Sequence, residues 1–162
     1  MTNKNTQIEV HTYNWGPCLI KVNILEDFRN ILLEEAKKTE IDFKDKLAGQ
    51  LASERGYSEQ QREKIIPYLS PYLGVYDEAF QRFQNKRFER KPEYTLTALW
   101  CNFQRPHEFN PPHDHDGKLS FVIYLSIPEP LKEENKKYSG RSCGPGGIQF
   151  MYGEGPRDCV SY

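Results

Sequence analysis

The sequence has few residues that bind metals or form crosslinks, with four histidines and four cysteines among its 162 residues. The cysteines are widely spaced and form no Cys-x-x-Cys pair, which argues against a structural zinc site or a thioredoxin-like motif. No stretch is apolar for long enough to span a membrane, and the first residues lack the apolar segment of a signal peptide. We therefore expect a cytoplasmic chain with free thiols and no membrane-spanning segment.

The sequence also has no large excess of positive or negative charge. The 22 basic and 23 acidic residues leave a formal net charge of -1. This balance predicts no general attraction to nucleic acid or to anionic membranes. The length fits one domain, residues 1–162, and the many aromatic residues predict an aromatic-rich core. Any role in binding nucleic acid would need a local basic patch.

The first half of the sequence has helical spacing. Apolar residues recur every three or four positions over residues 24–38, which predicts an amphipathic helix. Ser58 and Gln61 have the spacing of a capping box and predict the start of a second helix. Pro67 is expected to end that helix, and Pro71 is expected to begin a third.

The second half changes to a two-residue alternation, which predicts strands over residues 96–103 and 119–127. Two shorter strands are expected at residues 8–11 and 18–22. The charged residues 131–137 predict a solvated connector. Helices followed by strands favour an α+β fold in which helices cover a sheet or barrel.

The clearest functional signal lies between the two longer predicted strands, in the run Asn-Pro-Pro-His-Asp-His-Asp-Gly at residues 110–117. On an extended backbone, residues two apart point to the same side, so His113 and His115 can converge on one ion while Asp114 points away. The four-residue histidine spacing of helical zinc proteases is absent. Imidazoles with a carboxylate and open positions are the ligands of non-haem iron oxygenases. The pattern therefore predicts a metal site at His113 and His115.

This part of the sequence resembles the 2-oxoglutarate- and Fe(II)-dependent oxygenases with a prolyl-hydroxylase-like core, especially their small phage and marine bacterial members. The likeness is carried by residues 100–102, 110–115 and 119–125 and is loose elsewhere. It implies an α+β fold in which N-terminal helices pack on a double-stranded β-helix, or jelly roll. It also implies a hydroxylase that uses Fe(II) and the small-molecule co-substrate 2-oxoglutarate, with an unknown primary substrate.

The resemblance implies that His113 is the first metal ligand. The family usually has Asp two residues later, where this sequence has His115, so we expect His115 as the second ligand. Asp116, Asp114 and His107 are candidates for the third. The family's distal histidine and arginine have no counterpart after His115. We therefore expect either a domain without its C-terminal strands or a site completed by His107, by another chain or by a different metal geometry. A chain without those strands would bind iron weakly, turn over 2-oxoglutarate poorly and expose a sheet edge able to pair with another chain.

Two alternative functions remain open at this point. Cupins also place His-x-His on a barrel strand, but their motif continues with a Glu where this sequence has Leu119 and Ser120. A non-catalytic binding or virion-associated module could keep the barrel scaffold without turnover. In each case we expect neither a membrane nor a nucleic acid as partner.

Overall fold

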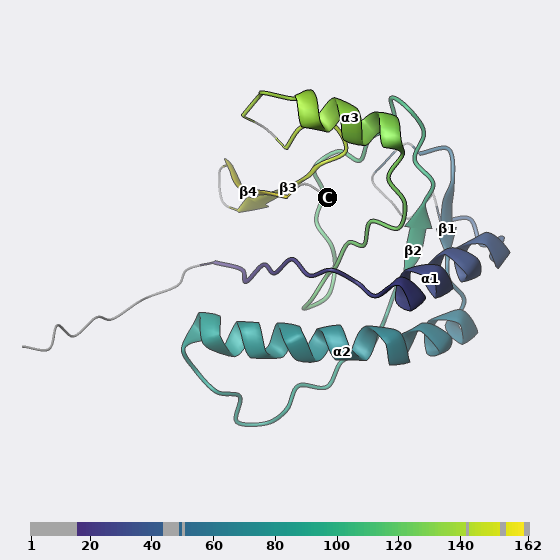
Figure 1. The fold of residues 1–162 in the computed structure, drawn as a ribbon. Coiled ribbons are helices and arrows are strands. Elements are labelled where there is room, and N and C mark those ends of the chain that lie inside the picture. Colours follow the sequence, from purple (N-terminus) through teal and green to yellow (C-terminus); the bar gives the residue numbers. More distant parts are fainter. Residues whose placement is uncertain (1–15, 44–48, 50, 142, 153–154, 161–162) are drawn as a thin grey trace, which may run out of the picture.

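The computed structural model describes residues 16–43, 49, 51–141, 143–152 and 155–160. Its elements, in chain order, are α1 (Glu26–Lys38), β1 (Glu54–Gly56), α2 (Glu59–Gln84), β2 (Trp100–Asn102), α3 (Glu129–Lys137), β3 (Ile148–Tyr152) and β4 (Gly155–Val160). β1 pairs with β2 and β3 pairs with β4, both in antiparallel fashion. The described residues thus form a small α+β fold (Figure 1).

The core lies where α1, α2 and the β1–β2 sheet meet (Figure 1). α1 contributes Phe28, Leu32 and Ala36, which share one face because they are four residues apart. α2 contributes Ile65 and Leu69 with the same spacing. The expected helix over residues 24–38 is therefore confirmed as α1, and its apolar face is the packing surface.

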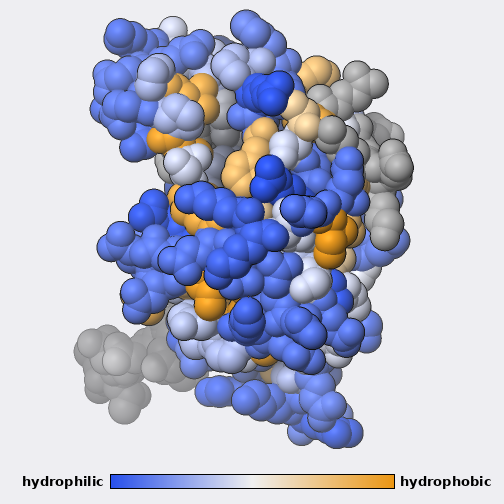
Figure 2. Space-filling model, turned by 90° about the vertical axis from the view of Figure 1, so that its right-hand side faces the viewer, coloured by the Kyte–Doolittle hydropathy of each residue, from blue (hydrophilic) through white to orange (hydrophobic). Residues whose placement is uncertain are grey.

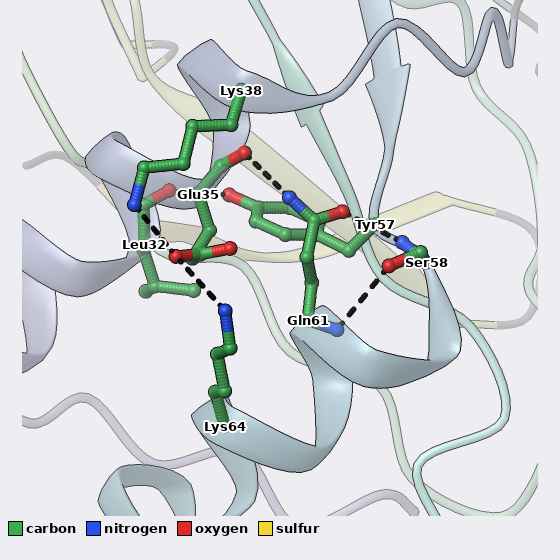
Figure 3. A network of polar contacts seen from close by, with 7 residues as sticks. All are labelled: Leu32, Glu35, Lys38, Tyr57, Ser58, Gln61 and Lys64. Carbon is green, nitrogen blue, oxygen red and sulfur yellow. Dashed lines mark hydrogen bonds and ion pairs between the residues drawn. The ribbon is translucent and has the colours of Figure 1, made fainter.

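A polar network joins the end of α1 to the start of α2 (Figure 3). Ser58 and Gln61 form the predicted capping box, which is confirmed by reciprocal side-chain to backbone hydrogen bonds. The Gln61 amide Nε2 also donates to the Glu35 carbonyl over 2.8 Å. The Tyr57 hydroxyl donates to the Leu32 carbonyl over 2.9 Å. These bonds fix the first turn of α2 against the last turns of α1.

The prediction of a double-stranded β-helix is wrong. The described residues contain two two-stranded sheets, and residues 119–127 join no β-ladder among them. Residues 18–22 are likewise not a strand, and the strand expected over 96–103 is reduced to β2. Alternation makes a segment suited to a strand, but a ladder also needs a partner segment. The cupin and binding-module alternatives assumed the same barrel, so this correction applies to their fold as well. The strand expected at residues 8–11 lies outside the described residues.

Two helix predictions are also wrong. α2 continues through Pro67 and Pro71, which were expected to separate two helices. Both prolines face solvent, so water can satisfy the carbonyl groups that lose their intrahelical donors. Residues 131–137, expected to be a connector, belong to α3. Charged pairs three residues apart, such as Lys132 with Glu129, stabilise that helix.

The described cysteines are in two different states. Cys18 and Cys101 are free, as expected, whereas Cys143 is disulfide-bonded, which corrects the expectation of free thiols throughout.

The face in Figure 2 is mostly hydrophilic, with hydrophobic side chains gathered in separate small patches. Within the described ranges, every helix is too short or too polar to cross a membrane.

Candidate metal-binding site

The structure brings His113 and His115 together in the loop that follows β2. Their Nε2 atoms are 3.1 Å apart, and their ring planes meet edge-on at 75° with the ring centroids 4.7 Å apart. Both side chains are exposed. The two imidazoles therefore converge at a point that an ion could reach from solvent.

The tautomer of His113 follows from a backbone contact. Its Nδ1 lies 2.7 Å from the Pro111 carbonyl oxygen, which can only accept a hydrogen bond. Nδ1 therefore carries the ring proton, and the lone pair of Nε2 accepts a hydrogen bond from Nε2–H of His115 over 3.1 Å. Metal-binding histidines usually have this arrangement, because the second nitrogen donates to a carbonyl or carboxylate and so orients the ring.

His115 is held by an aromatic contact in addition to its hydrogen bond with His113. Its ring lies on Trp100 of β2, with the centroids 5.6 Å apart and the planes tilted by 36°. Partial burial lowers the pKa of His115, the neighbouring His113 lowers it further, and Asp114 acts in the opposite direction. A neutral imidazole at pH 7 needs no deprotonation before it binds a metal.

The distance between the two nitrogens can be compared with known metal geometry. Ligand nitrogens about 2.1 Å from one ion are about 3.0 Å apart at right angles and about 3.4 Å apart in a tetrahedron. The observed 3.1 Å is closer to the right-angle value. The distance also corresponds to a hydrogen bond between the two rings, which an ion bound to both nitrogens would replace.

The third ligand is not assembled. Asp114, Asp116 and His107 all lie in the described part of the chain, where no group of three or more histidine, cysteine, aspartate or glutamate side chains could hold a metal ion. The site described by the structure is thus a pair of imidazoles. Its remaining coordination positions would have to be filled by exogenous ligands.

Glu108, which the sequence analysis did not select, organises the turn that precedes the histidines. Its carboxylate accepts hydrogen bonds from the backbone N–H of Ala52 over 2.9 Å and of Arg105 over 2.8 Å. The Gln104 side chain also donates to the Glu108 carbonyl, and His107 in this turn has a left-handed φ of 69°. The contact with Ala52, 56 residues away, had no signal in the sequence.

Comparison with known proteins gives no further assignment, because no protein family model, curated protein or solved structure matches the sequence. The resemblance to 2-oxoglutarate oxygenases therefore stays a prediction. Function has to be inferred from the two imidazoles and their surroundings.

Proposed function

We propose that this chain binds a divalent transition metal through His113 and His115 and, with Fe(II), acts as a 2-oxoglutarate-dependent oxygenase. The observation that supports the metal site is the 3.1 Å separation of the two Nε2 atoms. The hydrogen bond from His113 to Pro111 adds the orienting contact that metal-binding histidines usually have. Iron is chosen over zinc because the sequence resembles the 2-oxoglutarate oxygenases, whose metal is Fe(II), and because imidazoles with open positions belong to the ligand set of non-haem iron.

The two residues have separate roles in this proposal. His113 presents a fixed lone pair, because its Nδ1 proton is engaged by Pro111. His115 supplies the second nitrogen from a ring held against Trp100. Bound Fe(II) with 2-oxoglutarate and O2 supplies the chemistry that inserts an oxygen atom into a C–H bond. Both imidazoles are exposed, so co-substrate and substrate can approach from solvent.

Two protein ligands predict a weak iron site that depends on its co-substrate. 2-Oxoglutarate is a bidentate anion, and it would add two oxygen donors and balance the positive charge of the ion. By linkage, each of the two ligands should then raise the affinity for the other. Iron binding should therefore be tighter with 2-oxoglutarate than without it.

The decisive experiment is an anaerobic Fe(II) titration by calorimetry, with and without 2-oxoglutarate. We compare the wild-type chain with His113→Ala, His115→Ala and the matched control His11→Ala, which removes a histidine far from this loop in the sequence. We expect one bound ion, an affinity at least about 10-fold lower in the first two variants, and no change in the control. Equal binding by all four proteins would reject the metal site.

The oxygenase activity is tested separately, by adding O2 to the iron-loaded chain and measuring succinate formed from 2-oxoglutarate. We expect slow formation that requires both His113 and His115. A second candidate, a metal-binding module without turnover, is favoured by the lack of a third ligand among the described residues. Metal binding that is indifferent to 2-oxoglutarate and yields no succinate would support that candidate and reject the oxygenase.

A further inference from the structure

Four rings contact one another in a column that begins beside the β1–β2 sheet and ends at the histidine pair. Phe43 and Trp100 are nearly parallel, with centroids 5.7 Å apart and planes 17° apart. Trp100 then contacts His115 at 5.6 Å, and His115 contacts His113 at 4.7 Å. The column connects the sheet directly to one of the proposed metal ligands.

The base of the column depends on a glycine. Gly56 of β1 is the register partner of Trp100 in β2. A Cβ atom at Gly56 would lie 2.6 Å from Cδ2 of Phe43, so Phe43 could not keep its position beside any larger residue. The backbone around Phe43 is also anchored, because Phe43 N–H donates to the Glu54 carbonyl and Gly56 N–H donates to the Ile41 carbonyl, both over 3.0 Å. The Phe43 ring is thus held in place beneath Trp100.

Besides the indole, His115 contacts His113, through the hydrogen bond between their Nε2 atoms. It lies in an exposed loop, and an imidazole there can rotate about both of its side-chain bonds. Rotation away from the indole would separate its Nε2 from that of His113. Contact with a flat aromatic face restricts the ring plane, because edge-on and offset arrangements are preferred over others.

We propose that Trp100 is the positioning residue of the metal site: its indole, supported by Phe43 above Gly56, sets the ring plane of His115 so that both Nε2 atoms face one ion. This inference rests on the proposed metal site. It assigns no contact with the ion to Trp100, which acts only through His115.

The stack also makes Trp100 a reporter of the site. The chain has two tryptophans, so Trp15→Phe leaves Trp100 as the single indole. Co(II) bound to His115 should quench the fluorescence of the adjacent indole. In the metal-free chain, the ring current of Trp100 should shift the proton resonances of His115 upfield.

The test uses Co(II) as the probe in the Trp15→Phe background, with binding followed by calorimetry and by Co(II) absorption. We expect Trp100→Phe to keep the affinity within about 3-fold, because it retains an aromatic face, and Trp100→Ala to lower it about 10-fold. Gly56→Ala, which contacts neither histidine, should weaken binding and reduce the quenching of Trp100. Phe88→Ala removes another stacked ring, at 5.9 Å from Phe80, and is the control for general destabilisation.

The outcomes separate the two claims. Weaker Co(II) binding in Trp100→Ala and normal binding in Phe88→Ala, together with a smaller His115 ring-current shift in Gly56→Ala, support the positioning role. Wild-type affinity in Trp100→Ala, or an equal loss in Phe88→Ala, overturns it while leaving the metal site intact. Failure of the wild-type chain to bind Co(II) overturns both. If Trp100→Ala does not fold, the Co(II) affinities of Gly56→Ala and Phe88→Ala are compared instead. Weaker binding in Gly56→Ala alone supports the positioning role, and equal affinities overturn it.

Discussion

Replacement of Gln61 by alanine should weaken the contact between the end of α1 and the start of α2 and lower the stability of the fold. The Gln61 side chain is buried, with 9% of its surface exposed. Its Nε2 donates to the Glu35 carbonyl over 2.8 Å, and its Oε1 accepts from the Ser58 N–H over 2.9 Å. Alanine removes both bonds and leaves a buried carbonyl at Glu35 without its side-chain donor (Figure 3).

The expected cost follows from these two bonds. Each contributes about 1 kcal/mol net, and the carbonyl left without its donor adds about 1 kcal/mol more, so the free energy of unfolding should fall by about 3 kcal/mol. For a chain of this length, that corresponds to a melting temperature about 6–12 °C lower. Ser58→Ala removes only the cap bond to the Gln61 N–H and should cost about 1 kcal/mol.

The assay is urea unfolding followed by far-UV circular dichroism, with Gln61→Glu as the discriminating variant. Glutamate can still accept from Ser58 N–H, but it cannot donate to the Glu35 carbonyl and brings a second charge near the Glu35 carboxylate. We therefore expect Gln61→Glu to be destabilised although glutamate suits this capping position. The reasoning is refuted if Gln61→Ala costs no more than Ser58→Ala, or if Gln61→Glu is as stable as wild type.

Two further predictions concern the same core. The hydrogen bond from Lys38 holds the pKa of Glu35 below its usual range despite burial. Glu35 therefore stabilises the fold fully above the pKa of an unfolded glutamate and loses this contribution as the pH falls through its folded-state pKa. Urea midpoints measured at decreasing pH should therefore fall less steeply in Glu35→Gln, and an unchanged slope would contradict this. Ile65→Ala, at a position only 1% exposed, should cost about 3 kcal/mol, whereas Ile66→Ala, at 41% exposed, should cost under about 1 kcal/mol. Similar losses in the two variants would show that Ile65 is not in the core.

Local patterns in the sequence were sufficient to predict some of these elements. The apolar spacing of α1 and the pair Ser58 and Gln61 lie within one or two helical turns, so the chain itself brings the interacting groups together. The same holds for His113 and His115, which are two residues apart and meet in the structure as expected. Their role as metal ligands stays a prediction.

Other features were decided by contacts between distant segments. The alternation over residues 119–127 could not predict whether a partner strand lies beside it, and the described residues place none in a ladder with it. The prolines of α2 are tolerated because they face solvent, which depends on how the helix packs. The long-range hydrogen bond of Glu108 to Ala52 had no pattern in the sequence.

The sequence by itself therefore determined the helix α1, the capping box and the paired histidines, because each depends on residues that are neighbours along the chain. Only the tertiary structure decided that the strands form two short sheets rather than a barrel, and that Trp100 lies against His115. Hydrogen bonds between strands and stacking of rings both need groups from distant parts of the chain, and no spacing in the sequence specifies which of those groups will meet.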